Sequence, residues 1–213
     1  MYYARQREEM VENQLKRRGI TDKRVLRAFE EVKRELFVPA NLKSMAYRDQ
    51  PLPIGYSQTI SQPYIVAKMT QMLEVEEDSK ILEIGTGSGY QAAILSNLGS
   101  RVYTMERIGE LRKKAKENLN KHNIKNVQVV QGDGTIGLSQ YEPFDRIIVT
   151  AASPAVPDIL IDQLANNGIM VIPVGNINSQ YLLKLVKKDD EIIKQEYDAC
   201  RFVPLVGRFG FKE

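Results

Sequence analysis

The sequence predicts an α/β protein with a doubly wound, mostly parallel sheet, preceded by helices and followed by antiparallel strands. Three observations support this prediction. A glycine-rich turn follows the short apolar strand at 80–84 and opens an amphipathic helix. From residue 80 onward, strand and helix patterns alternate, which is typical of parallel sheets with right-handed crossovers. Three successive strands also end in polar groups, which would gather at the sheet edge where open α/β folds bind ligands.

The composition indicates a globular protein from a reducing compartment. Its 213 residues are 43% hydrophobic and carry a net charge of +3, enough for a sizeable core but not for a nucleic-acid-binding surface. Cys200 is the only cysteine, so an internal disulfide is impossible, and we interpret it as an inert thiol. His122 is the only histidine, which argues against a Ser-His-Asp triad and a metal site. The chain shows no secretory signal and no apolar run of ~18 residues, so we expect a soluble, cytoplasmic protein.

Residues 1–78 are expected to form a helical extension with a substrate loop. A mostly polar helix over 5–18 ends at Gly19, a common helix stop. Asp22 can cap a second helix, whose apolar positions follow the 3.6-residue period. The stretch from there to about residue 62 has no periodicity of its own, which is typical of functional loops.

The cofactor-binding core is predicted over residues 79–175, and antiparallel strands with a tail over 176–213. The expected strands are 80–84, 101–106, 127–131, 146–150 and 169–173, and the expected helices are 63–73, 89–98, 108–121 and 155–165. Two further strand patterns, 181–186 and 191–197, flank the polar turn at 188–190 and predict a hairpin at one sheet edge. We expect these three parts to form a single domain.

The glycine turn suggests a cofactor cradle. Gly85, Gly87 and Gly89 alternate along it, as suits a backbone that closely approaches a bound ligand. Their spacing is G-x-G-x-G rather than G-x-G-x-x-G, so a pyrophosphate ligand is not indicated. Glu83 lies in an otherwise apolar strand, where a carboxylate can pair with a positively charged group of a cofactor. Taken alone, the glycines also fit an ordinary strand-to-helix turn.

Two downstream acids strengthen the cofactor interpretation. Glu106 ends the second strand about 20 residues after the first glycine, where an acid accepts hydrogen bonds from ribose hydroxyls. Asp133 stands between Gly132 and Gly134 after the third strand, where it can meet an adenine amino group. Together with the turn, these acids predict an adenosine-containing ligand.

The hydroxyl residues before the helix at 63–73 have two interpretations. Thr59 or Ser61 can simply cap that helix. Either can also orient a substrate, because a helix N-terminus attracts anions. The sequence leaves both possibilities open.

Several segments resemble known families. Residues 82–90 resemble the first motif of Rossmann-like S-adenosylmethionine-dependent methyltransferases, which implies that fold. More narrowly, segments 59–63, 132–134, 144–152 and 201–205 are similar to the protein-L-isoaspartate (D-aspartate) O-methyltransferase family, in the same order over nearly the whole chain. The resemblance implies S-adenosyl-L-methionine as donor, S-adenosyl-L-homocysteine as product and isoaspartyl residues of damaged proteins and peptides as acceptors. It also implies a methyl ester that collapses to a succinimide, which can reopen to aspartate.

The resemblance also implies the site residues. It places Ser61 and Thr59 at the catalytic centre, with Ser61 as a positioning group, because a carboxylate acceptor is already ionised and needs no general base. The implied cofactor-binding residues are Gln58, Ile60, Glu83, Gly85, Thr86, Gly87, Ser88, Gly89, Glu106, Arg107, Asp133 and Gly134. The chain departs from the family at Tyr64, where many relatives have histidine, and the tail after Leu205 varies among relatives.

Two alternatives remain open. A methyltransferase acting on nucleic acid or a small molecule would share the cofactor site, but base methylation typically uses an Asn/Asp-Pro-Pro-aromatic segment where this chain has 150–154, Thr-Ala-Ala-Ser-Pro. A non-enzymatic nicotinamide-binding module would leave Glu83 and the 59–61 segment unexplained. We therefore expect protein and peptide partners, no nucleic acid, no membrane and a monomeric state.

Overall fold

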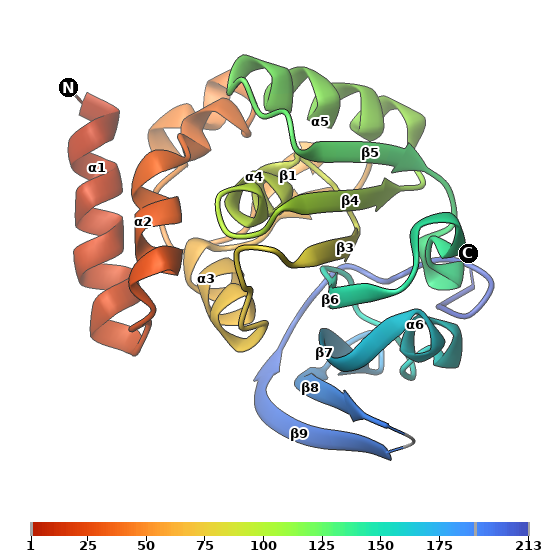
Figure 1. Cartoon of the computed structure of the whole chain (residues 1–213). Coiled ribbons are helices and arrows are strands. Elements are labelled where there is room, and N and C mark those ends of the chain that lie inside the picture. Colours follow the sequence, from red (N-terminus) through yellow and green to blue (C-terminus); the bar gives the residue numbers. More distant parts are fainter. Residues whose placement is uncertain (1, 190, 213) are drawn as a thin grey trace.

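The strand order of the central sheet indicates where a ligand-binding site is expected. The computed structural model describes residues 2–189 and 191–212, and its seven-stranded sheet has the order β5-β4-β3-β6-β7-β8-β9 (Figure 1). The strands are β3 (Lys80–Ile84), β4 (Arg101–Glu106), β5 (Val127–Gln131), β6 (Phe144–Val149), β7 (Leu164–Gly175), β8 (Gln180–Lys188) and β9 (Glu191–Cys200). The first five in spatial order are parallel and the last two are antiparallel, as predicted. The order reverses between β3 and β6, which makes their carboxyl ends the expected ligand site.

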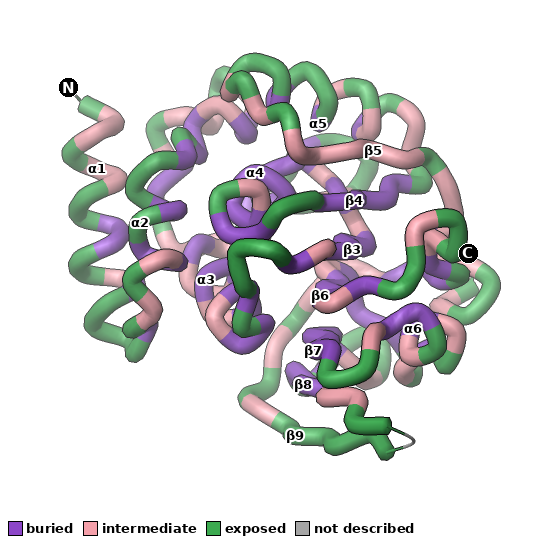
Figure 2. Tube along the Cα trace, viewed as in Figure 1, coloured by how far each residue is buried: buried purple, intermediate pink, exposed green. Residues whose placement is uncertain are grey.

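Helices cover both faces of the sheet. They are α1 (Tyr2–Met10), α2 (Lys23–Glu31), α3 (Pro63–Met72), α4 (Tyr90–Ser96), α5 (Gly109–Lys121) and α6 (Asp158–Asp162). Alternate strand residues enter two cores, because successive side chains of a strand point to opposite faces. Ile81 of β3 packs into the core that contains residues of α2 to α5, whereas Leu82 packs into the core that contains Leu160 of α6. The inner parallel strands β4, β3, β6 and β7 are therefore largely buried on both sides, while the edge strand β5 is half-buried and β9 is largely exposed (Figure 2).

The N-terminal extension is helical, but less regular than predicted. The expected helix over 5–18 is α-helical only to Met10, continues as a π-helix at Val11–Leu15, and ends in a 3₁₀ turn before Gly19 in the left-handed region. Met10 and both ends of the π-helix are buried, so tertiary packing rather than propensity shapes this segment. The predicted cap of α2 is confirmed, because the Asp22 side chain accepts hydrogen bonds from the N–H groups of Arg24 and Val25.

The segment before residue 62 is more ordered than expected. It contains a short antiparallel hairpin of β1 (Leu52–Gly55) and β2 (Gln58–Ile60). Tyr56 and Ser57, at its turn, both have positive φ values, of 54° and 56°. Hairpin turns of this kind normally carry Asn or Gly, so the sequence lacked the usual signal. The hairpin leads directly into α3.

Two predicted boundaries in the second half of the chain were wrong. The helix expected over 155–165 is reduced to α6, and β7 begins at Leu164 because this residue already pairs with Phe144 of β6. The predicted hairpin is confirmed as β8 and β9, although residue 190 in its turn lies outside the described residues. Along the described chain, we find no helix with the length and apolar character that crossing a bilayer requires.

Candidate active site

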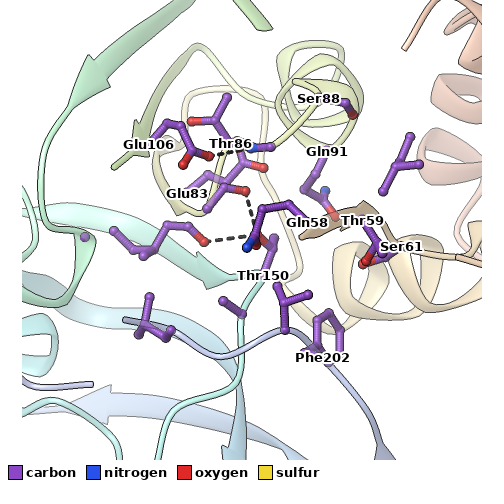
Figure 3. Close-up of a pocket in the computed structure, with 18 of the residues that line it drawn as sticks. Gln58, Thr59, Ser61, Glu83, Thr86, Ser88, Gln91, Glu106, Thr150 and Phe202 are labelled. Atoms are coloured by element: carbon purple, nitrogen blue, oxygen red, sulfur yellow. Dashed lines mark hydrogen bonds between the residues drawn. The ribbon is translucent and has the colours of Figure 1, made fainter. Parts of the chain in front are cut away.

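A pocket opens at the carboxyl ends of β3, β4 and β6. It encloses about 900 Å³ of empty space, part of it open to solvent. Figure 3 shows Glu106 and Thr86 on one side of the pocket, Thr59 and Ser61 on another, and Phe202 at its lower edge. The predicted site residues that line the pocket are Gln58, Thr59, Ile60, Ser61, Glu83, Gly85, Thr86, Gly87, Ser88, Glu106, Arg107 and Gly134. The predicted residues Gly89 and Asp133 lie outside this lining.

The turn after β3 is held tightly against the neighbouring strands. Gly85 has a φ of +99°, and a Cβ atom on it would lie 2.5 Å from the Oγ1 atom of Thr150. The Gly85 N–H donates to the carbonyl of Met105 at 3.0 Å, and the Thr150 hydroxyl donates to the Gly85 carbonyl at 2.7 Å (Figure 3). Only glycine fits this position, between a left-handed backbone and the end of β6.

Gly89 has a different task from the other two glycines. It precedes α4 with a φ of +87°, and a Cβ atom on it would meet Ala115 and Leu119 of α5 at 3.4 Å. The third glycine of this turn therefore allows α4 and α5 to pack closely, which explains its absence from the pocket lining. Its predicted contact with a cofactor stays a prediction.

Backbone donors orient the carboxylate of Glu106. Its Oε2 atom accepts a hydrogen bond from the Gly87 N–H at 2.9 Å, and its Oε1 atom accepts one from the Ile108 N–H at 3.0 Å. The residue is 7% exposed and lines the pocket. Each carboxylate oxygen has two lone-pair directions, so acceptor capacity remains for the hydroxyl groups of a ligand.

Glu83 is a buried carboxyl group without a partner. It is fully buried, and neither of its oxygens has a hydrogen-bond partner with good geometry, because the neighbouring Thr104 hydroxyl bonds to the Thr86 hydroxyl. Burial raises its pKa to about 8, the Thr104 hydroxyl partly opposes this shift, and the nearby Glu106 charge adds to it. A buried, unsatisfied carboxyl group beside a pocket is costly unless a ligand completes it. Its chemistry suits a positively charged ligand group, as the sequence suggested.

The opposite wall of the pocket comes from β2 and the start of α3. The N-cap of α3 is Gln62, and its side chain makes no cap hydrogen bond. The Asp49 carboxylate instead accepts a hydrogen bond from the Tyr64 N–H at 3.0 Å, in the first turn of α3. The first-turn N–H that a side chain does bind is thus taken by Asp49, so the interpretation of Thr59 or Ser61 as a simple cap is wrong. The Ser61 hydroxyl is thus not committed to capping.

The same loop borders a second cavity. Thr59, Ser61, Thr150 and Phe202 line both cavities, so the two spaces meet at the Ser61 loop. The second cavity also contains Cys200, whose pKa is raised to about 11 by burial, so this thiol is protonated at neutral pH. The arrangement therefore provides two adjoining spaces, one beside the glycine turn and one beyond the Ser61 loop, which could hold two different ligands.

Asp133 faces the C-terminal tail. It accepts hydrogen bonds from the Thr135 N–H at 2.9 Å, the Thr135 hydroxyl at 2.7 Å and the Arg208 N–H at 2.8 Å. Burial alone would raise its pKa, but these hydrogen bonds outweigh that effect and lower it. The expected contact of Asp133 with adenine stays a prediction, while its observed role is to anchor the tail. Gly134 beside it lines the pocket, and a Cβ atom there would lie 2.4 Å from Ile84.

The sequence interpretation missed part of the lining. Thr150 ends the predicted strand 146–150 at the same sheet edge as Glu106, so the strand-end rule contained a signal for it. Gln91 donates a hydrogen bond to the Thr70 hydroxyl at 2.9 Å, and its place on the pocket side of α4 had no distinct signal. Residues 202–206 reach the pocket from beyond β9, a long-range contact that local patterns do not contain.

Comparison with known proteins shows which family this chain is similar to. The sequence pattern of the family described as protein-L-isoaspartate(D-aspartate) O-methyltransferase (PCMT) matches residues 5–210. A protein-L-isoaspartate O-methyltransferase of Methanoculleus marisnigri is 51% identical over 208 residues, covering 98% of this chain and 94% of that protein. One from Petrotoga mobilis is 51% identical over 213 residues, covering 99% of this chain and 100% of that protein.

Solved structures agree with this placement. A structure named protein-L-isoaspartate O-methyltransferase superposes with a TM-score of 0.87 at 30% identity, covering 96% of this chain and 67% of that one. A Plasmodium falciparum structure, described as a protein of the same kind in complex with S-adenosyl-L-homocysteine, gives a TM-score of 0.80 at 26% identity, covering 96% and 98% of the two chains.

Proposed function

The chain belongs to the protein-L-isoaspartate(D-aspartate) O-methyltransferase family, and from this premise we propose that its pocket performs the repair reaction. The enzyme transfers a methyl group from S-adenosyl-L-methionine to the free carboxylate of L-isoaspartyl residues in damaged proteins and peptides. The resulting ester leads through a succinimide to aspartate. The observation that supports this most directly is the meeting of the cofactor turn and the Ser61 loop in one pocket.

The donor side fits the cofactor. When bound, S-adenosyl-L-methionine supplies an electrophilic methyl group on a positively charged sulfur. Glu83 offers an unpartnered carboxyl group for a positive charge of the ligand, and the fixed carboxylate of Glu106 accepts hydrogen bonds from ribose hydroxyls. Gly85 and Gly87 line the pocket with positive φ values, a conformation that lets the backbone of the turn come close to a bound ligand.

The acceptor side supplies orientation rather than a base. An isoaspartyl carboxylate is ionised at neutral pH, so no residue has to remove a proton from it. The hydroxyls of Thr59 and Ser61 hold this carboxylate in line with the methyl group, and good alignment can contribute ~7–11 kcal/mol. His122 stacks on Phe37 with ring centroids 4.7 Å apart and does not line the pocket, which is consistent with a reaction that needs no histidine base.

The remaining expectations are part of the proposal. We propose a monomer that works in the cytoplasm on proteins and peptides and not on nucleic acid. The net charge of only +3 and the single cysteine support this view. We also propose that 1–78, 79–175 and 176–213 act as one domain, because α2, α3 and the sheet share one core cluster.

A comparison of paired peptides tests the function. Labelled S-adenosyl-L-methionine is offered with two peptides that differ only in an aspartyl or isoaspartyl linkage. We expect methylation of the isoaspartyl peptide alone. Equal methylation of both would refute the repair function while leaving the donor site intact, and methylation of neither peptide would direct attention to a small-molecule acceptor.

A further inference from the structure

A buried arginine lies behind the acceptor loop. Arg34, in the 3₁₀ turn Arg34–Leu36, has an exposed fraction of 0%. Among the residues that the structure describes, no carboxylate forms a salt bridge with it, although the Tyr90 hydroxyl and the Asp49 charge favour its charged form, and its Nη1 atom is buried without a well-oriented hydrogen-bond partner. Burial lowers its pKa, but an arginine remains charged at neutral pH. A buried charge without a direct salt bridge is costly, so the presence of Arg34 at this position needs a physical reason.

The Arg34 guanidinium donates hydrogen bonds to two backbone carbonyls. The Nη2 atom of Arg34 donates to the carbonyl of Ser61 at 2.7 Å, and the Nε atom donates to the carbonyl of Ala46 at 2.7 Å. The planar guanidinium thus joins the loop that carries the Ser61 hydroxyl to the segment that follows the 3₁₀ turn Ala40–Met45. Lysine has one ammonium head and cannot reproduce this fork.

The same guanidinium faces the cofactor side. Its Cζ atom lies 4.7 Å from the centroid of the Tyr90 ring, and Tyr90 lines the pocket directly after the glycine turn. Phe29 and Phe37 hold this ring independently, at centroid distances of 6.0 Å and 5.5 Å. Loss of Arg34 should therefore disturb the Ser61 loop more than the cofactor turn.

We propose that Arg34 is a positioning residue for the methyl acceptor, acting through the Ser61 carbonyl and through its buried positive charge. This inference rests on the proposed function. The hydrogen bond sets the orientation of the Ser61 peptide, and through it the direction of the hydroxyl. The charge attracts a carboxylate into the adjoining cavity without contacting the attacking oxygen, which would otherwise become less nucleophilic. Because the Arg34 charge acts from behind the Ser61 loop, it can attract the substrate carboxylate while leaving its attacking oxygen free to react.

Two substitutions separate the effect of the paired guanidinium hydrogen bonds (the fork) from the effect of the positive charge. Arg34→Lys keeps the charge and loses the fork, whereas Arg34→Met loses both. Methylation of the isoaspartyl peptide is measured at saturating S-adenosyl-L-methionine, and S-adenosyl-L-homocysteine affinity is measured by calorimetry without peptide, at a temperature where circular dichroism shows each variant folded. We expect Arg34→Lys to lower kcat/KM by about tenfold or more, since small misplacements near a reacting group are costly. Cofactor affinity should stay within about twofold, a split that a general loss of stability would not produce.

Arg146 provides the matched control. It is 7% exposed and donates to the carbonyls of Glu74 and Asp145, both at 2.9 Å, but lines neither cavity. We expect Arg146→Lys to lower the melting temperature without this kinetic split. A folded Arg34→Lys enzyme with wild-type kcat/KM, or an equal loss of cofactor affinity and turnover, would overturn the proposal.

The charge has its own test. Arg34→Met should raise the peptide KM further than Arg34→Lys does, and equal KM values in the two variants would remove the charge from the proposal. These outcomes are separate from the proposed function, because the wild-type enzyme on paired aspartyl and isoaspartyl peptides decides that question first.

Discussion

The Glu106 carboxylate accepts a hydrogen bond from the Gly87 N–H at 2.9 Å, so the end of β4 and the turn after β3 form one unit. The acid is oriented before any ligand arrives, because its second oxygen is held by the Ile108 N–H at 3.0 Å. A group fixed in this way loses little freedom on binding, which favours affinity. The turn, in return, is held in place by the residue that would meet the ribose.

Glu106→Gln should weaken cofactor binding. The substitution keeps the volume but replaces one acceptor with an NH₂ group that faces a backbone N–H. Hydrogen bonds to charged groups contribute about 1.5–3 kcal/mol, so we expect S-adenosyl-L-homocysteine affinity to fall by about tenfold or more. At saturating cofactor, kcat should change little. Calorimetry and methylation kinetics check the two expectations, and wild-type affinity in the variant would exclude the ribose contact.

Ser61→Ala should have the opposite effect. It removes a hydroxyl at the meeting point of the two cavities while leaving the cofactor turn untouched. We expect kcat to fall by about tenfold or more, as when a positioned hydrogen-bond group is lost, with cofactor affinity within about twofold. Ser57→Ala, at the exposed hairpin turn, is the control and should remain fully active. Unchanged turnover in Ser61→Ala would remove this residue from the mechanism.

Glu83 should make stability depend on pH. Burial raises its folded-state pKa to about 8 from the ordinary value of 4.5, so the folded protein binds its proton more tightly than the unfolded chain does. The associated stability is fully present below pH 4.5 and is lost as pH rises through about 8. Glu83→Gln is neutral at every pH and should lack this loss. Melting temperatures of the two proteins between pH 5 and pH 9 check this, and parallel curves would contradict it.

Glu83 should also link cofactor binding to proton release. A positively charged ligand group favours the ionised carboxylate, so binding near pH 7 must expel the proton that burial retains. Calorimetry in two buffers of different ionisation enthalpy should show proton release in the wild type. Glu83→Gln should release none and bind more weakly. Equal proton release in both proteins would mean that the ligand charge lies elsewhere.

Local patterns predicted most of the cofactor side and less of the acceptor side. Glu83, Gly85 and Glu106 lie at strand ends or in the turn between strand and helix, and those positions follow from periodicity and glycine spacing. The interpretation of Ser61 or Thr59 as a cap of α3 failed because the competing partner, Asp49, comes from another segment of the chain. Contacts between distant segments are invisible to a local pattern.

The same limit explains the remaining omissions. Arg34 carries a charge in a sequence context that looks exposed, and only the tertiary structure shows that it is buried against the Ser61 loop. Phe202 reaches the pocket from the segment after β9, and no local sequence pattern around it predicts this contact. Burial of charge and closure by a distant tail depend on the whole fold, whereas helices, strands and glycine turns depend mainly on their own residues.

Gly85→Ala should cost more than an ordinary substitution of a left-handed glycine. The φ of +99° alone costs an alanine about 1–2 kcal/mol, and its Cβ atom would also lie 2.5 Å from the Thr150 Oγ1 atom. Gly19→Ala isolates the first effect, because Gly19 has a φ of +88° and a Cβ atom there meets nothing within 4 Å. We expect the Gly85 variant to unfold at a lower temperature than the Gly19 variant and to lose cofactor affinity, which the Gly19 variant keeps.

Thr150→Ala separates the steric part of the Gly85 effect from the backbone part. Without Oγ1 the new methyl group has room, so adding Gly85→Ala to Thr150→Ala should cost less than adding it to the wild type. The positive φ persists in the double variant, and recovery should therefore be partial. Thermal unfolding of all four proteins of this cycle, with cofactor affinity for each, measures the coupling. Additive effects would show that Thr150 moves aside without cost, and would leave the left-handed backbone as the sole reason for glycine at this position.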